Sequence, residues 1–173
     1  GVLPFGTRAE IPFWVEGGFG VMSVRLIQER LDSYACASAI GEDQALREIT
    51  QEIVLAALGR TSFFDKAAFQ GGTCLRIFHG VNRFSEDLDF ALKQGDESFD
   101  LGMYLKIVGE DLNAFGYQIE IDDRGAVDDV VKKAFLKDDS IGRLLKLGFR
   151  PMSGPHRKIR IKLEVDSNPP SGA

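Results

Sequence analysis

The sequence predicts an α+β fold, layered as in α/β proteins, in which helices flank a mixed β-sheet. Apolar residues recur at helical spacing over 42–58 and 101–115, and they alternate with polar residues at strand spacing over 158–166. Predicted strands and helices also alternate along the chain, as expected for helices packed on a sheet. The length of 173 residues is enough for one core-forming domain.

The N-terminal part is predicted to contain two helices after an irregular segment. Glycines and prolines interrupt any periodic pattern at the start of the chain, which indicates a flexible arm or extension without an assigned function. Apolar spacing predicts a short helix over 22–34 and an amphipathic helix over 42–58, with Gly41 as a break and Gly59 as a C-cap. The expected division is a flexible arm at 1–21, N-terminal helices that pack on the core at 22–60, and a core domain at 61–173.

From residue 61 onward, short strands are expected to alternate with helices. Phe63, Phe64 and Phe69 predict a short strand that ends at a glycine pair, followed by a helix from Thr73 to His79. Periodicity alone does not distinguish helix from strand at 126–135, and 140–147 is mixed. The further expected elements are a strand at 85–92, a loop at 93–100, a helix at 101–115, a strand at 117–121, a turn at 122–125 and a strand at 158–166.

Composition excludes several classes of protein. The hydrophobic share of 44% and the charged share of 27% indicate a globular chain rather than a disordered one. No apolar run approaches the roughly 20 residues of a membrane helix, and the first residues lack the apolar core of a signal peptide. Cys36 and Cys74 are too few for a disulfide framework and lack metal-ligand spacing, which favours free thiols in a cytoplasmic protein.

The charge is unevenly distributed. The net charge is −5, yet residues 126–162 carry ten Lys and Arg against four Asp, a local charge of +6. A basic segment on an acidic protein is able to bind polyphosphate or nucleic acid. A solvated surface is the equally weighted alternative.

Two weak signals become informative because they lie close together. Gly71 and Gly72 open a predicted helix, where backbone N–H groups are able to approach a phosphate closely. Asp87 lies fourteen residues after Thr73, and Asp89 follows two residues later. Both lie in a predicted strand, so their side chains point to the same side. Neighbouring carboxylates repel unless a cation lies between them. A phosphate-binding turn beside a divalent-metal site is the minimal requirement for metal-assisted phosphoryl or nucleotidyl transfer.

Other nucleotide-binding and catalytic patterns are missing from the sequence. There is no Gly-x-x-x-x-Gly-Lys-Ser/Thr loop, and the third glycine of a dinucleotide-binding fingerprint is absent. No Ser/His/Asp or Cys/His arrangement is evident. Each half of the pattern also has a simpler interpretation, because a glycine pair often forms a tight turn and exposed acids are common on edge strands.

A third carboxylate is expected from the last predicted strand. Glu164 and Asp166 lie on its polar side and would join the aspartate pair if the two strands are neighbours. All-oxygen ligands favour Mg²⁺, and two ions are expected. The alternative is ion pairing with Arg160 and Lys162. The candidate metal ligands are Asp87, Asp89, Glu164 and Asp166, of which the first three are the candidate catalytic residues.

Polar residues around the glycine turn complete the candidate nucleotide site. Arg76 lies one turn into the predicted helix, within reach of a phosphate or of a surface acid such as Asp65. Arg83 precedes the acidic strand, and the hydroxyl of Ser85 lies on the same side as the aspartate pair. The candidate nucleotide-binding residues are Gly71, Gly72, Thr73, Arg76, Arg83 and Ser85.

At this point the sequence resembles a known family. The run Phe-x-Gly-Gly-Thr-x-Leu-Arg-x-Phe-x-Gly-x-x-Arg-Phe-Ser-x-Asp-Leu-Asp-Phe at 69–90 is similar to the signature of the AbiEii/AbiGii-type nucleotidyltransferase toxins. The resemblance continues upstream through 42–58 and 63–66, and downstream to 161–166.

The resemblance implies a polymerase-β-like nucleotidyltransferase fold and transfer of an NMP from an NTP to an acceptor such as tRNA or another RNA. It implies a toxin that acts opposite a cognate antitoxin, in toxin–antitoxin or abortive-infection systems. By position, Gly71, Gly72 and Thr73 would hold the triphosphate, Asp87 and Asp89 would bind Mg²⁺, and Glu164 would be the third carboxylate. Members of the family usually continue with a further helical region, so we expect the fold here without that C-terminal region.

Two other functions stay open. The chain is also interpretable as a catalytically incomplete domain that binds an antitoxin or RNA. A kinase-like phosphotransferase would use the same metal chemistry, and the reaction product distinguishes it from a nucleotidyltransferase.

Overall fold

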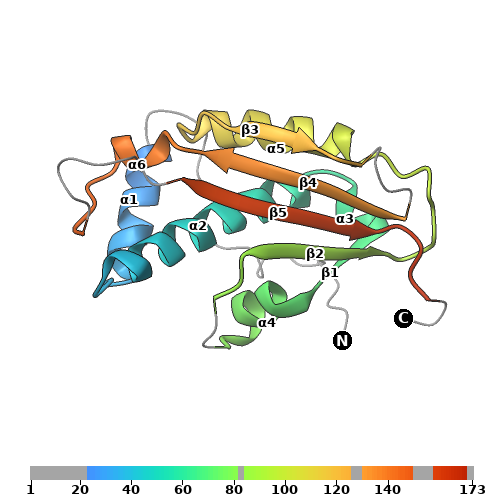
Figure 1. Cartoon of the computed structure of the whole chain (residues 1–173), viewed down its shortest axis with the longest axis horizontal. Helices are drawn as coiled ribbons and strands as arrows, with labels where there is room; N and C mark the ends of the chain where they lie inside the picture. Colours follow the sequence, from blue (N-terminus) through green and yellow to red (C-terminus); the bar gives the residue numbers. More distant parts are fainter. Residues whose placement is uncertain (1–22, 82–83, 126–129, 150–157, 171–173) are drawn as a thin grey trace.

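A five-stranded mixed sheet forms the centre of the structure, which is a computed structural model (Figure 1). It describes residues 23–81, 84–125, 130–149 and 158–170, so the expected arm at 1–21 lies outside the described residues. The elements in chain order are α1 (Ser23–Ser33), α2 (Ala39–Gly59), α3 (Phe63–Lys66), β1 (Ala67–Gln70), α4 (Gly71–His79), β2 (Asp87–Leu92), α5 (Gly102–Ala114), β3 (Glu120–Asp123), β4 (Val131–Asp138), α6 (Ile141–Leu144) and β5 (Ile159–Asp166).

The strand order is β1-β2-β5-β4-β3, which brings distant parts of the sequence together. Strands β1 and β2 are antiparallel, and β5 pairs parallel with β2 and antiparallel with β4. Strand β3 closes the far edge, antiparallel to β4. This mixed sheet with flanking helices confirms the α+β class predicted from the sequence.

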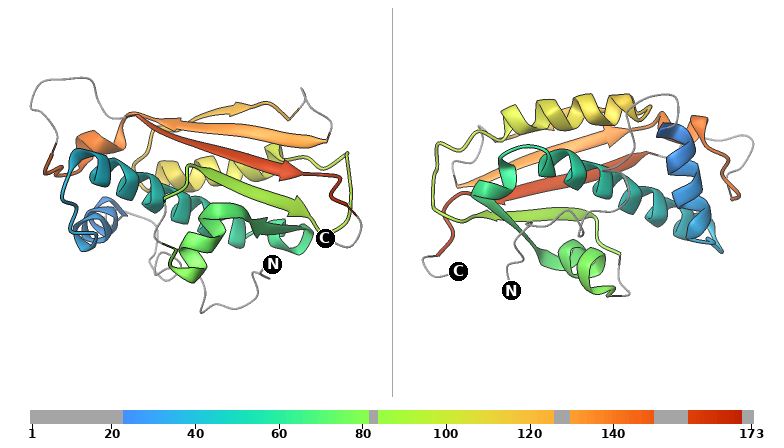
Figure 2. Two further views of the ribbon diagram at one scale, coloured as in Figure 1. Left: turned by 60° about the horizontal axis from the view of Figure 1, so that its bottom comes forward. Right: turned by 180° about the vertical axis from the view of Figure 1, so that it is seen from behind.

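Helices α2 and α5 lie on one face of the sheet, as the view from behind shows (Figure 2). Helix α4 leaves β1 and continues along the edge of the sheet beside β2. In the described parts of the chain, Figure 1 shows no helix over the opposite face, which is called the open face below. The open face carries the alternate side chains of β2 and β5 that include the predicted acids.

The covered face contains the hydrophobic core. Phe63, Phe69 and Phe90 are fully buried, and the ring of Phe63 meets those of Phe90 and Tyr104 edge-on at centroid distances of 4.9 and 5.2 Å. Edge-to-face contacts of this kind are favourable beyond the area that they bury. The same core includes residues of α1 and α2, as expected for helices that pack on it, while the proposed division at residue 60 stays a prediction.

The ends of the long N-terminal helix differ from the prediction. Helix α2 begins at Ala39 because Ser38 caps it, with the Ser38 hydroxyl accepting a hydrogen bond of 3.0 Å from the Gly41 backbone N–H. Gly41 therefore lies inside the first turn and does not break the chain. Gly59 is the last helical residue, and Arg60 takes the C-cap position.

Several short elements were also predicted with wrong bounds or types. Residues Phe63–Lys66 form a helical turn before β1, although a single strand was expected there. Strand β3 begins at Glu120 rather than at 117, because the Tyr117 hydroxyl bonds the buried Thr50 and the Gln118 N–H bonds the Asp138 carboxylate. Strand β4 resolves the ambiguous segment after residue 126 as extended chain from Val131 onward.

Candidate active site

The pairing of β2 with β5 sets the predicted acids side by side. In the parallel register Asp87 faces Lys162 and Asp89 faces Glu164 across the two strands. Side chains alternate along a strand, so all four point to the open face while Leu88 and Leu163 are buried beneath them. The expectation that the last strand lies beside the aspartate pair is confirmed.

The glycine turn lies against the same acids. Gln70, the last residue of β1, pairs with Asp89, and α4 begins at the next residue. Gly71 has a φ of +82°, and a Cβ atom there would lie 2.9 Å from Oδ2 of Asp89. Only glycine combines this backbone conformation with so close an approach. The turn and the acidic strand are therefore neighbours, as the sequence predicted.

Thr73 has a different environment from the rest of the turn. Its side chain is buried, and its hydroxyl donates a hydrogen bond of 2.5 Å to the backbone carbonyl of Asp87. This bond joins α4 to β2 at the first metal-ligand candidate. The structure thus gives Thr73 a positioning contact, and its predicted contact with a triphosphate stays a prediction.

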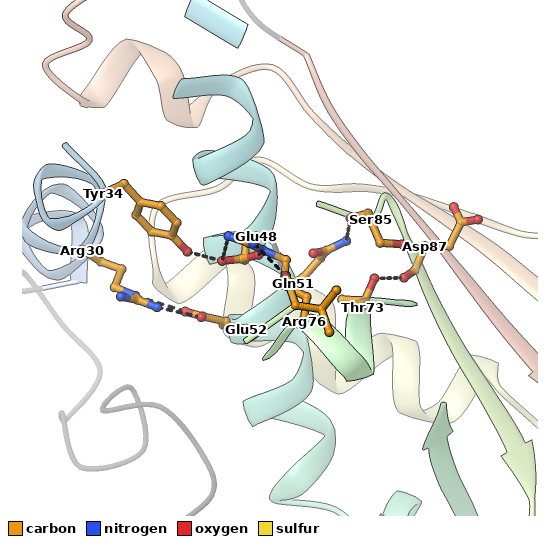
Figure 3. A network of polar contacts seen from close by, with 10 residues as sticks. Arg30, Tyr34, Glu48, Gln51, Glu52, Thr73, Arg76, Ser85 and Asp87 are labelled. Atoms are coloured by element: carbon orange, nitrogen blue, oxygen red, sulfur yellow. Dashed lines mark hydrogen bonds and ion pairs between the residues drawn. The ribbon is translucent and has the colours of Figure 1, made fainter. Parts of the chain in front are cut away.

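Arg76 points away from the acids and into a polar network, which Figure 3 shows. Its guanidinium pairs with Glu48 of α2, donates to the Val81 carbonyl at 3.1 Å and lies 3.6 Å from the centroid of the Phe84 ring. A surface pair with Asp65 was the alternative considered from the sequence, and the observed partner is instead the buried Glu48. A phosphate contact for Arg76 stays a prediction.

Helix α2 anchors the loop that leads into β2. The Gln51 amide donates 2.9 Å to the Ser85 carbonyl, which fixes the backbone just before the acids (Figure 3). The hydroxyl of Ser85 lies on the side of Gly72, where a Cβ atom would be 3.7 Å away. Arg83, another predicted nucleotide ligand, lies outside the described residues. Gln51 was not predicted as a site residue because its spacing in α2 resembles that of any polar helical residue.

Lys162 is a further site residue that the sequence analysis treated only as an alternative ion-pair partner. Its ammonium lies 3.0 Å from Oε1 of Glu164 and 3.7 Å from Oδ2 of Asp87. The hydrogen bond to Glu164, opposed by desolvation and helped by Asp87, raises the pKa of Lys162 above its usual value. The signal in the sequence was its position two residues before Glu164, which puts both on one side of the strand.

Asp89 is the least neutralised member of the cluster. Burial raises the pKa of the Asp89 carboxyl, and the negative charges of Asp87 and Glu164 raise it further, while Lys162 acts in the opposite sense. A carboxyl that is partly desolvated beside two like charges favours its protonated form. A cation bound nearby would therefore stabilise the charged form of the Asp89 carboxyl.

The acids fit a hard divalent cation by type and register, but not in their present rotamers. Within the described residues, no three His, Cys, Asp or Glu side chains are arranged to hold a metal ion. Lys162 lies between Asp87 and Glu164 instead. Asp166 accepts a 3.0 Å hydrogen bond from the Asn168 N–H, a contact typical of a turn that follows a strand. Carboxylate oxygens are nevertheless the ligands that Mg²⁺ prefers.

A groove next to the acids was not predicted. It has a volume of about 380 Å³ and is lined by Arg47, Glu86, Asp87, Phe135, Arg160 and Lys162, and it is called the basic groove below. Its only trace in the sequence was the positive charge of residues 126–162, which include three of its lining side chains.

Comparison with known protein families decides the relationship. The family described as "Nucleotidyl transferase AbiEii toxin, Type IV TA system" matches residues 53–172. The chain belongs to the AbiEii family. The matched region of this AbiEii domain runs from within α2 to beyond the end of β5 and contains the glycine turn and all the candidate acids. No curated protein and no solved structure matches the chain. No helix among the described residues is both long and apolar enough to cross a membrane.

Proposed function

We propose that this AbiEii domain is an Mg²⁺-dependent nucleotidyltransferase that transfers an NMP from an NTP to an RNA acceptor such as tRNA. The observation that carries the proposal is the contact between Gly71 and Asp89, because it joins a phosphate-binding turn to an under-neutralised acid cluster. Perturbed carboxyl groups that lie beside a ligand-binding turn are typical of catalytic sites.

Each part of the site has its own task in this proposal. The backbone N–H groups of Gly71, Gly72 and Thr73 at the start of α4 bind the triphosphate, where the helix dipole favours negative charge. Asp87, Asp89 and Glu164 would hold Mg²⁺, with Asp166 as a peripheral candidate. Two bound ions supply the positive charge that activates the acceptor hydroxyl and stabilises the leaving pyrophosphate.

The network of α2 keeps these parts in register. Glu48 holds α4 through Arg76, Gln51 holds the loop at Ser85, and Thr73 joins α4 to β2 at Asp87. Positioning of reacting groups contributes a large share of the rate in phosphoryl-transfer enzymes. These contacts therefore hold the proposed site in position from outside, and they touch no substrate.

The family supports a biological setting for this reaction. We infer that the chain is the toxin of a type IV toxin–antitoxin system, that a cognate antitoxin protein counteracts it, and that it serves in abortive infection. We place the reaction in the cytoplasm, where NTPs and RNA are available.

Label transfer from [α-³²P]NTP to RNA, with Mg²⁺ supplied, tests the proposal. We expect the wild type to label RNA and the Asp89→Ala variant to be inactive, and we expect calorimetry to detect binding of NTP to the wild type. Glu110→Ala, which removes an exposed acid from α5 on the covered side, is the matched control and should stay active. Absence of NTP binding by the wild type would contradict the proposal.

One observation favours a second function. Lys162 occupies the space between Asp87 and Glu164, and no described group of three acids is arranged for a metal. A catalytically incomplete domain that binds an antitoxin or RNA would have these properties. An Asp87→Ala/Asp89→Ala double variant, compared with the wild type, separates the two functions. A nucleotidyltransferase labels RNA as the wild type and loses label transfer in the double variant, whereas a binding module captures antitoxin or RNA in both forms and transfers label in neither.

A further inference from the structure

The basic groove and the glycine turn lie on opposite sides of the acidic strand. The glycine turn follows β1, which is the neighbour of β2 on one side. Arg160 and Lys162 of the groove belong to β5, on the other side of β2, and Phe135 belongs to β4 beyond it. In a phosphoryl transfer the attacking and leaving oxygens lie roughly in line. If the turn binds the triphosphate, the groove is on the side from which the acceptor approaches.

Arg160 is an exposed guanidinium that attracts Asp122 of β3 electrostatically without a hydrogen bond between them. It lies over the Phe135 ring, 4.3 Å from the ring centroid, and makes no hydrogen bond or ion pair with any described residue. The guanidinium of Arg124 lies over the same ring at 4.8 Å. Arginines ordered on an aromatic ring present flat cations at low entropic cost, which suits stacking on a base or pairing with a phosphate.

Arg47 brings a second incompletely paired guanidinium to the groove. Its Nη1 lies 3.2 Å from the carboxylate of Glu86, whose side chain is 74% exposed. Its Nε atom is buried and has no hydrogen-bond acceptor within the part of the chain that the structure describes. A buried donor without an acceptor is costly. The Arg47 side chain as a whole is 24% exposed, so an incoming anionic oxygen would meet its terminal nitrogens rather than the buried Nε.

Cross-strand register adds a further sign of a missing anion. Lys137 of β4 lies directly opposite Arg160 of β5, and like charges in this position destabilise a sheet. Asp122 lies 3.9 Å from the Lys137 ammonium and also attracts Arg160, and it is shared with Arg124, so one carboxylate balances three cations. The next pair towards the acids is Phe135 opposite Lys162. Cations therefore follow the open face from β4 to the acids, with an aromatic ring among them.

We infer that the basic groove is the binding site for the single-stranded end of the acceptor RNA. Arg160 on Phe135 stacks on or pairs with the terminal nucleotides, and Arg47 binds a backbone phosphate. Stacked aromatic and guanidinium groups beside cations are the usual means of binding single-stranded RNA. Binding of an acidic peptide requires the cations but not the stacked surface. This inference rests on the proposed function, because it assigns the acceptor side of the same site.

Fluorescence anisotropy with a 5′-labelled single-stranded RNA oligonucleotide, on the full chain, tests the assignment. We expect Arg160→Ala to weaken RNA binding roughly tenfold, and Arg47→Ala by a similar factor, since one stacked base or phosphate contact has about this effect. Arg160→Lys should recover only part of the loss because it keeps the charge without the planar group. Lys162 is left unchanged because it also contacts the acids.

Charge-matched and ligand-matched controls make the outcomes distinguishable. Lys106→Ala removes one cation from α5 on the covered side and should leave RNA binding and label transfer unchanged. Calorimetry should show that Arg160→Ala binds NTP within about twofold of the wild type, because a substitution on the acceptor side should act independently of the NTP site. Each lost phosphate contact should also reduce the slope of log affinity against log salt by about 0.7.

Three results overturn the inference. Equal losses in Arg160→Ala and Lys106→Ala would indicate general charge attraction, and unchanged RNA binding in both groove variants would exclude the groove. Stronger binding of an acidic peptide than of RNA at the same charge would assign the groove to a protein partner. Absence of NTP binding by the wild type would instead refute the proposed function. The RNA anisotropy of the groove variants would still decide whether the groove binds RNA.

Discussion

Two groups of carboxylates in this protein differ in how completely they are neutralised. Glu48 and Glu52 of α2 are nearly buried, and each has strong donors. Glu48 accepts from Tyr34 at 2.6 Å and pairs with Arg76, while Glu52 pairs with Arg30 at 2.9 Å (Figure 3). Burial, and then the bond to Glu48, raise the pKa of Tyr34, which keeps its proton in the network.

The second group is Asp87, Asp89 and Glu164 on the open face. Its ion pairs within the described residues are both made by Lys162, and Asp89 has a raised pKa. A complete set of partners stabilises a fold, whereas an incomplete set lowers stability until a ligand supplies the missing charge. Charge balance therefore separates the structural acids from the functional ones.

The largest expected effect comes from the functional group. Asp89→Asn should reduce nucleotidyl transfer at least roughly 10²-fold, because even outer-shell partners of metal ligands have effects of 10–100-fold. The same variant should unfold at an equal or higher temperature in metal-free buffer, because a repelled charge is removed. Label transfer and thermal unfolding measure the two quantities, and a large loss of stability would contradict the comparison.

The structural group should respond in the opposite way. Glu48→Gln leaves the half-buried Arg76 without its counter-charge and should lower the free energy of unfolding by about 3 kcal/mol. Denaturation in urea measures this change. Glu29→Gln, which breaks the exposed pair of Arg25 and Glu29, is the control and should cost less than about 1 kcal/mol. Similar losses in the two variants would show that the Glu48 network is not specially important.

A pair of glycines tests the contact between the turn and the acids. Gly71 and Gly80 both have positive φ, so alanine at either position should cost about 1 kcal/mol of backbone strain. Only at Gly71 would the new Cβ meet Asp89, since no described residue lies within 4 Å of a Cβ at Gly80. Gly71→Ala should therefore reduce NTP affinity measured by calorimetry, whereas Gly80→Ala should retain it. Equal affinities in the two variants would separate the turn from the site.

The smallest effect should be the pH dependence of stability. Because the pKa of Asp89 is higher in the folded protein than its ordinary value of 3.8, the folded state binds this proton more tightly than the unfolded chain. The free energy of unfolding contributed by Asp89 is therefore lost as the pH rises through the folded pKa. In metal-free buffer the wild type should lose stability relative to Asp89→Asn over that interval, as urea denaturation at a series of pH values would show. An opposite trend would indicate that Lys162 fully neutralises the group.

Local patterns in the sequence were sufficient for much of the fold and of the candidate site. Strand alternation in Ile159–Asp166 and helical spacing in Gly102–Ala114 predicted the two elements well, because each buries one regular side against the core. The glycine turn was predicted because two adjacent glycines favour a special backbone conformation. The shared side of Asp87 and Asp89 was predicted because residues two apart in a strand point the same way.

Other features depended on residues far apart in the sequence. The Gln51 amide bonds the backbone at Ser85, and the Tyr117 hydroxyl, just before β3, bonds Thr50. Neither contact is indicated by the neighbouring sequence. Helix α2 extends past Gly41 because the Ser38 cap outweighs the low helix propensity of one glycine in the first turn. Such outcomes are decided by which partners packing makes available.

Short-range spacing was enough to predict the family resemblance, the class of fold and the residue types of the acid cluster. Contacts between distant residues were needed to show that Lys162 lies among the acids, that Arg76 pairs with Glu48, and that a basic groove adjoins Asp87. The physical reason is that charge balance is a sum over neighbours in space. Parallel pairing of β2 with β5 brings Lys162 and Glu164 beside the aspartate pair across more than seventy residues of chain.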